Sequence, residues 1–300
     1  MIAVTRHAEW DARIARAREL ADRHPAADEL LRFYSALAEY QKALAAGHGG
    51  DGGNGTRSTR RHGDTDRSSG AFDIERVLDA IPAFLAWLQS VAPTELAAAV
   101  EDLSTRNRDQ LKQCLASAEA VRRKDAGGGE LLAPGRSHES VNQDSELSDN
   151  PTVRFVVESL LQPFADELVT ATATKPALGA ATMRCPRCAG LPVAAVLREA
   201  GHGSRRYLLC ALCLTEWECL RIVCPSCGEQ EFGRLPVYTA EQFPHVRIDA
   251  CDRCHHYIKT IDLTKDGHAV PCVDDIASVS LDLWAREQGY TRLKRNVLGI

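Results

Sequence analysis

Four Cys-x-x-Cys pairs in the last 120 residues constrain this 300-residue chain more than any other feature. They use eight of its eleven cysteines and consist of Cys185 and Cys188, Cys210 and Cys213, Cys224 and Cys227, and Cys251 and Cys254. A Cys-x-x-Cys turn lets two thiolates face one metal ion. Two such turns close a tetrahedral shell of four sulfurs, which suits Zn²⁺ or a single iron. The sequence therefore predicts metal-bound ribbons in the C-terminal part of the chain.

The spacing between the pairs repeats along the chain. There are 21 residues between Cys188 and Cys210, and 23 between Cys227 and Cys251. Four pairs can combine into two sites in three ways, but consecutive pairing closes the shorter loops and follows the repeat. We therefore expect a tandem of two ribbons with two metal ions. Spacing does not separate zinc from iron.

The N-terminal sequence bears on the redox state of these cysteines. MIAVTRHAEWDARIARARELAD lacks the apolar core of a secretory signal, and no run approaches the roughly 18 apolar residues of a membrane span. A cytoplasmic protein without membrane insertion is expected. Because cytoplasmic thiols stay reduced, the paired cysteines are expected to hold metal and not to form disulfides.

A closed shell of four cysteines limits the chemistry of a bound metal. It leaves no coordination position for water or substrate, so hydrolytic catalysis is not expected. The remaining roles are a structural metal that stabilises a small β-domain, which the spacing favours, and a redox-active or redox-sensing iron. The sequence contains no Walker loop and no HExxH, so we do not expect an enzyme.

The charge distribution argues against nucleic acid as a partner. The whole chain has a formal net charge of −5, and residues 184–300 contain 15 Lys and Arg against 14 Asp and Glu. Four thiolates outweigh a divalent or trivalent cation, so the metal-bound part should be acidic overall and poor at gripping phosphates.

Hydrophobic periodicity divides the chain into a helical part and a ribbon part. Residues 1–180 are expected to form a helical domain, with disordered insertions at 47–70 and 125–149 that are rich in Gly, Ser and charged residues. The first ribbon is expected at 181–222, the second at 223–272, and a C-terminal helix and tail at 273–300. Within the helical domain, one helix after Pro93 is expected to continue through Leu111 and Leu115.

Some candidate site residues lie outside the four pairs. Cys114 is expected to be a small buried side chain on a helix, and Cys219 to face the ribbon core; Cys272 has no predicted role. His255 and His256 directly follow Cys254, where hydrogen bonding or exposure is favoured over metal ligation.

Several motifs, in this order, resemble the formate dehydrogenase accessory protein family, FdhE: CPRCAGLPV, RYLLCALCLTEW, CPSCGE, CDRCHHYIKTID and DDIASVSLDLWAREQGY. The resemblance covers about residues 10–46 and 150–300. One departure is Ala189, where such a turn often carries Gly, and we expect a shifted turn there because Gly190 follows. The fold class implied is α+β: an all-α N-terminal helical domain, tandem rubredoxin-like (zinc-ribbon-like) metal ribbons with four cysteines each, and a C-terminal helix.

The resemblance also implies ligands and a function. The first site would consist of Cys185, Cys188, Cys210 and Cys213, the second of Cys224, Cys227, Cys251 and Cys254, with iron favoured and zinc the alternative. The protein would be a cytoplasmic maturation factor that contacts the catalytic subunit of a respiratory formate dehydrogenase before twin-arginine export. Two alternatives stay open: a rubredoxin-like electron carrier and a zinc-ribbon nucleic-acid-binding protein.

Overall fold

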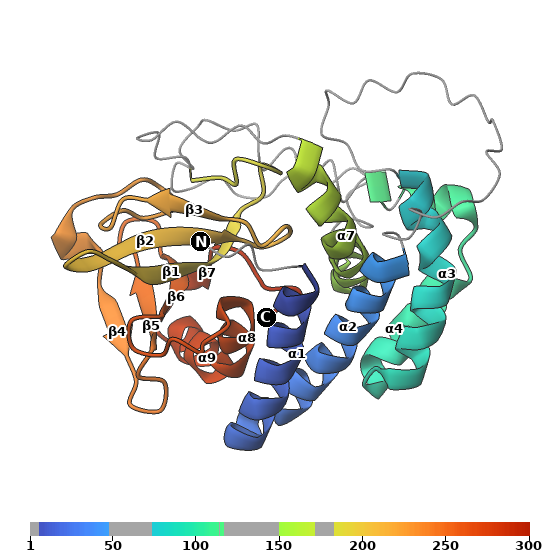
Figure 1. Cartoon of the computed structure of the whole chain (residues 1–300), viewed down its shortest axis with the longest axis horizontal. Coiled ribbons are helices and arrows are strands. Elements are labelled where there is room, and N and C mark those ends of the chain that lie inside the picture. The colour runs from blue at the N-terminus through green and yellow to red at the C-terminus, as the bar shows by residue number, and fades with distance from the viewer. Residues whose placement is uncertain (1–5, 48–73, 114, 117–149, 172–182) are drawn as a thin grey trace.

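The structure is a computed structural model of the chain, and it describes residues 6–47, 74–113, 115–116, 150–171 and 183–300. Cys114 and the two predicted insertions, apart from Gly47, lie outside these residues. Helices precede the sheet along the chain, and two cysteine clusters lie in the sheet region, which confirms the predicted α+β class (Figure 1).

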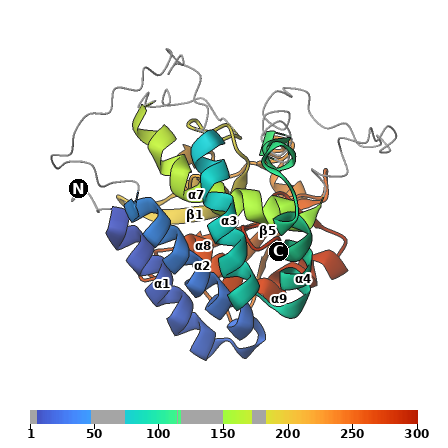
Figure 2. The same ribbon diagram turned by 90° about the vertical axis from the view of Figure 1, so that its right-hand side faces the viewer.

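The N-terminal half is built from helices whose apolar stripes face one another. They are α1 (Arg6–Arg23), α2 (Asp28–Gly47), α3 (Ile74–Val91), α4 (Thr94–Ser104) and α7 (Pro151–Ala171), with a short 3-10 turn at Pro25–Ala27. In α2, Leu31, Tyr34 and Leu37 recur at helical spacing and are buried. Figure 2 shows α1, α2 and α3 in front of the sheet from this side.

The predicted continuous helix after Pro93 was wrong. Helix α4 ends at Ser104, and residues 108–113 are helical again. Asn107 causes the break, because its side chain accepts a hydrogen bond from the N–H of Gln110 and its own N–H donates to the Gln110 side chain, both at 3.0 Å. This reciprocal capping starts a new helix.

The C-terminal half contains one seven-stranded sheet. Its strands are β1 (Pro192–Ala200), β2 (Gly203–Cys210), β3 (Glu216–Cys219), β4 (Val237–Thr239), β5 (Val246–Ala250), β6 (His256–Asp262) and β7 (Thr291–Arg292). The spatial order is β3-β2-β1-β6-β5-β4, with β7 beside β6. β1 and β6 pair in parallel, from Ala194 opposite Lys259 to Leu197 opposite Asp262. The two predicted ribbons therefore share a single sheet.

The C-terminal segment forms two short helices where one was predicted. They are α8 (Pro271–Ala277) and α9 (Val279–Glu287). The Ser278 hydroxyl donates to the carbonyl oxygens of Asp274 and Asp275, and Ser278 leaves the helical conformation with ψ of 33°. A serine that bonds back to the preceding turn disturbs a helix, which accounts for the break. Gly289 follows the end of α9 with φ of 84°, where a glycine is favoured.

Helix α8 joins the two halves. It contacts α1 and α2 on one side and β1 and β6 on the other, and Figure 1 shows α1 beside α8 beneath the sheet. One hydrophobic cluster runs from the N-terminal helices into the first ribbon and includes Leu37, Leu160 and Trp217. No helix in the part of the chain that the structure describes is long and apolar enough to cross a membrane.

Candidate metal centres

All four Cys-x-x-Cys pairs form the same backbone turn. The N–H of each first cysteine donates to the carbonyl five residues later: Cys185 to Gly190 at 2.9 Å, Cys210 to Thr215 at 3.0 Å, Cys224 to Glu229 at 2.8 Å and Cys251 to His256 at 3.0 Å. The residue after each second cysteine has a positive φ: Ala189 at 57°, Leu214 at 52°, Gly228 at 74° and His255 at 54°.

The turn at Ala189 is therefore not shifted, and that prediction was wrong. Ala189 itself adopts the left-handed conformation that glycine usually provides. Gly190 is needed for another reason: a Cβ atom there would lie 3.2 Å from the Cys210 sulfur and 3.3 Å from the Cys188 sulfur. The first pair thus keeps the common turn in spite of backbone strain at Ala189.

The first centre contains the sulfurs of Cys185, Cys188, Cys210 and Cys213, all buried and all within 4.8 Å of one another. Neighbouring sulfurs are 3.4 Å apart for Cys185 and Cys213, 3.3 Å for Cys188 and Cys210, and 3.6 Å for Cys188 and Cys213. A tetrahedral shell with metal–sulfur bonds of about 2.3 Å has sulfurs about 3.8 Å apart. These separations exceed a disulfide bond of about 2.05 Å and fit a shared metal ion.

The second centre contains Cys224, Cys227, Cys251 and Cys254, again within 4.8 Å. The sulfurs of Cys224 and Cys254 are 3.7 Å apart, as are those of Cys227 and Cys251. Three of these cysteines are buried, and Cys254 is partly exposed. The structure therefore brings together the two sets that consecutive pairing predicts.

The sulfurs in each centre are close enough to share protons. In the first centre, hydrogen bonding with Cys185 raises the pKa of Cys188 and lowers that of Cys213. In the second, hydrogen bonding between Cys224 and Cys254 lowers the pKa of Cys254 to about 3. In each centre, hydrogen bonding therefore favours the thiolate form of one sulfur, which is the form that binds metal. Metal binding would release the remaining thiol protons.

The two centres differ in what surrounds them. The four sulfurs of the first belong to the large hydrophobic cluster that the N-terminal helices also form. Those of the second form a small separate cluster, with Leu235 packed against it. The first centre is thus part of the main core, whereas the second lies outside that core.

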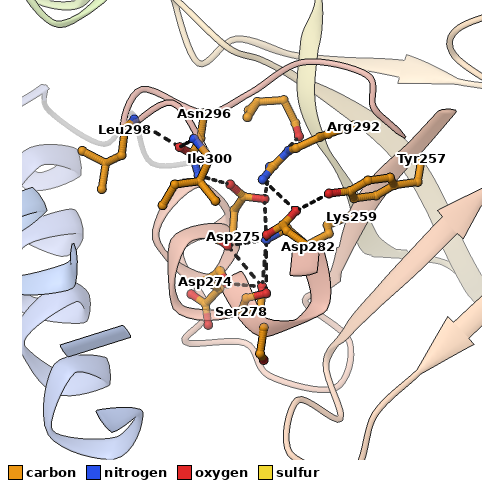
Figure 3. Close-up of polar contacts among 12 residues, drawn as sticks. Tyr257, Lys259, Asp274, Asp275, Ser278, Asp282, Arg292, Asn296, Leu298 and Ile300 are labelled. Atoms are coloured by element: carbon orange, nitrogen blue, oxygen red, sulfur yellow. Dashed lines mark hydrogen bonds and ion pairs between the residues drawn. The ribbon is translucent and has the colours of Figure 1, made fainter. Parts of the chain in front are cut away.

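A buried ionic network anchors the sheet to the C-terminal segment (Figure 3). Lys259 on β6 is fully buried and donates to Asp282 and to the carbonyl oxygen of Asp275, both at 2.5 Å. Arg292 on β7 pairs with the carboxylates of Asp275 and Asp282, and the Tyr257 hydroxyl donates to Asp282 at 2.7 Å. Burial opposes the charge of Asp275, but the Arg292 and Lys259 charges outweigh it and lower its pKa. The negative charges of Asp275 and Asp282 equal the positive charges of Lys259 and Arg292, which indicates a structural role for the network.

A third group of potential ligands lies between α1 and α8. One atom each of His245, Asp266 and Asp274 falls within 4.8 Å of the others. The Arg16 guanidinium already occupies this position, since its Nη2 lies 2.7 Å from a carboxylate oxygen of each aspartate. His245 Nε2 is also 2.8 Å from Asp274. This group joins α1 to α8 through an internal cation.

The other predicted site residues lie outside both centres. Cys219 is on the same face of β3 as the buried Trp217 and packs against the main core, as predicted. Cys272 is in α8, with its sulfur 3.7 Å from the Tyr34 hydroxyl. His255 is exposed. His256 Nδ1 lies 3.0 Å from the Cys254 carbonyl oxygen, and hydrogen bonding to the Cys254 side chain raises the pKa of His256. His256 therefore contacts the second centre without being one of its four sulfur ligands.

Sequence reasoning missed the buried charges. Lys259 lies in strand β6 directly after Tyr257 and Ile258, and Asp275 and Asp282 are seven residues apart in the C-terminal segment. In the single helix that the sequence predicts there, acids at this spacing would share one face, and this spacing was the signal available in the sequence. The pairing with Lys259 and Arg292 depends on tertiary contacts.

Comparisons with known proteins find matches over the residues that hold both centres. The family model "FdhE, central domain" matches residues 184–221, and "FdhE, C-terminal domain" matches residues 222–298. A "Protein FdhE homolog" of Aquifex aeolicus is 43% identical over 116 residues, which is 38% of this chain and 41% of that protein. A homologue of the same name in Pseudomonas aeruginosa is 35% identical over 119 residues, 38% of each chain. The chain thus aligns with about two fifths of the length of these curated relatives.

The fold extends the likeness to the rest of the molecule. The crystal structure of the FdhE protein from Pseudomonas aeruginosa superposes with a TM-score of 0.66 and 23% identity, covering 98% of this chain and 96% of that one. This likeness concerns the fold alone. The likeness to the FdhE family in sequence therefore rests on residues 184–298, which hold both cysteine clusters.

Proposed function

We propose that this protein is an accessory factor for the formation of active formate dehydrogenase and is not itself an enzyme. The observation that carries the proposal is that the FdhE-matching residues 184–298 contain both four-cysteine centres. Both centres have closed sulfur shells, which offer substrate no coordination position. The protein would act in the cytoplasm through contact with the catalytic subunit of the dehydrogenase, without nucleic acid and without membrane insertion.

Each centre binds one metal ion in this proposal, with all eight paired cysteines as ligands. The sulfur separations of 3.3–3.7 Å support it, because they approach the edges of a tetrahedral shell. Iron is favoured by the family resemblance, and zinc is the alternative. Elemental analysis after anaerobic purification should give two ions per chain. One ion per chain after full reconstitution would contradict the proposal.

A complementation experiment tests the function. Cells without this protein should make the catalytic subunit but show little formate oxidation, and the wild-type gene should restore it. The Cys185→Ser and Cys224→Ser variants should fail to restore it, because each loses one metal ligand. Cys219→Ser is the matched control, since Cys219 lies outside both centres, and it should restore activity. Normal formate oxidation in the deletion strain, with no second copy of the gene, would refute the proposal.

A further inference from the structure

A pocket with a cavity volume of about 220 Å³ opens beside the second centre. Cys224 and Cys251 contribute to its wall. Other parts of the wall come from strands β2, β4, β5 and β6, from the segments on either side of Cys224, from Phe232 and from Leu293. Figure 1 places β4 and β5 on the side of the molecule away from α3 and α4. The cavity is smaller than the roughly 300–1,000 Å³ that drug-sized ligands occupy, so it suits one or two side chains.

The mouth of the pocket is apolar and exposed. Of the six large hydrophobic side chains that are exposed among the described residues, three line this pocket: Ile222, Phe232 and Val237. Phe232 is 77% exposed, and Leu220, two residues before Ile222, is also exposed. Such a concentration of exposed apolar side chains marks an interaction site, because it is unfavourable in water without a partner.

The pocket wall is basic. Arg206 is only 2% exposed, and its Nε has no hydrogen-bond partner among the described residues. Its Nη1 donates to the Val223 carbonyl at 2.9 Å, and its Nη2 lies 3.1 Å from Asp249. Arg206 and Arg247 share the Asp249 carboxylate, since Arg247 also donates to it, at 2.8 Å.

Arginines outnumber acidic side chains in the pocket wall, where Arg206, Arg221 and Arg247 accompany the single carboxylate of Asp249. Arg221 is exposed, and its Nη1 donates to the Ser204 carbonyl oxygen at 3.1 Å. A metal ion in the second centre would leave one or two of the four sulfur charges uncompensated, so the pocket as a whole is close to neutral. The exposed Arg221 is therefore the cation that a partner carboxylate can pair with when an apolar side chain enters beside it.

We propose that this pocket is the docking site for a segment of the client protein that presents an apolar side chain next to an Asp or Glu. The apolar side chain enters between Phe232, Ile222 and Val237, and the carboxylate pairs with Arg221. The inference rests on the proposed function for the identity of the client, the catalytic subunit of formate dehydrogenase.

The test is a binding titration between the purified full-length protein and the purified catalytic subunit. Phe232→Ser and Arg221→Glu should each weaken binding at least about tenfold, the usual effect of truncating an interface anchor. Arg221→Glu should also reduce the dependence of affinity on salt concentration. Both side chains are exposed, so metal content and melting temperature should not change.

The controls are an apolar and a basic residue outside the pocket. Leu283→Ser removes an exposed apolar side chain from α9, and Arg205→Glu reverses an exposed charge on β2 next to Arg206. Both should bind the subunit as the wild type does. If the wild type binds and the pocket variants bind equally well, the docking inference is wrong and the proposed function stands. If the wild type itself does not bind, both are wrong.

A photocrosslinking experiment tests the chemistry of the occupant. A photoreactive benzoylphenylalanine at position 232 should link to a client segment in which an apolar residue adjoins an Asp or Glu, as identified by mass spectrometry. Crosslinks confined to segments without a carboxylate, or to a second copy of this chain, would overturn the inference.

Discussion

The left-handed residue after each second cysteine is glycine in only one of the four turns. Ala189 adopts φ of 57° and its side chain is exposed, so its methyl group contributes strain without burial. Ala189→Gly should therefore stabilise the protein by about 1 kcal/mol, the usual penalty of this conformation for a residue with a Cβ atom. Urea unfolding measures the change. Destabilisation would mean that the turn is not left-handed in solution.

The neighbouring Gly190 should respond in the opposite way. An alanine there would bring its Cβ to 3.2–3.3 Å from two sulfurs of the first centre, with no change in backbone preference to offset the crowding. Gly190→Ala should lower the metal content of the purified protein or make its metal easier to remove with a chelator. Gly203→Ala is the control, because nothing lies within 4 Å of the added atom, and it should keep both ions.

At the scale of elements, β1 holds the sheet together, since it pairs with β2 on one side and β6 on the other. Val196 lies in the middle of β1 and is fully buried. Val196→Asp would bury an unpaired charge and should destabilise the sheet by about 3 kcal/mol or more. Both centres should then release metal at a lower urea concentration, in one transition. Glu199→Gln, at the exposed end of the same strand, should change the urea concentration of metal release little. A shift confined to one centre would contradict a shared sheet.

The ionic network beneath the sheet makes a second prediction at this scale. Lys259→Met leaves Asp275 and Asp282 with one cation fewer in a buried position, which typically costs about 3–5 kcal/mol. Lys265→Met, at an exposed lysine just beyond the end of β6, should cost less than about 1 kcal/mol. Thermal unfolding of the two variants should separate them clearly, and equal stabilities would mean that the network is solvated.

For the whole molecule, the two centres should differ in how much stability they contribute. The first belongs to the core that the N-terminal helices share, and the second forms its own small cluster. Cys185→Ser and Cys227→Ser should each bind one metal ion where the wild type binds two. The melting temperature should fall further for Cys185→Ser, by at least about 4 °C, since each kcal/mol shifts it by about 2–4 °C in a chain of this size. Equal melting temperatures would contradict a shared core.

The sequence predicted the local features of this molecule better than the tertiary ones. The helices of the N-terminal part, the ribbon character of the C-terminal part and the grouping of the eight cysteines followed from spacing and periodicity. The parallel pairing of β1 with β6 could not be predicted, because it joins residues more than 60 positions apart and no turn links them. The same holds for Arg206, whose burial against Asp249 depends on the assembled sheet. Metal ligation itself stays a prediction from the sulfur geometry.

The strand order has a consequence for self-association. Across the sheet, the first ribbon has the order β3-β2-β1 and the second has the order β6-β5-β4. The second ribbon therefore repeats the strand order of the first, and the first strand of one ribbon, β1, pairs with the third strand of the other, β6. A head-to-tail repeat of this kind does not close into a ring. Strand β4 of one molecule could pair with β3 of the next molecule, as β1 pairs with β6 within one molecule, and continued pairing would give a filament. The two outer strands are only three and four residues long, and such short edges offer little backbone for further pairing. The short length of β3 and β4 thus prevents this repeat from continuing between molecules. A longer β3 or β4 would create a sheet edge that can form fibres.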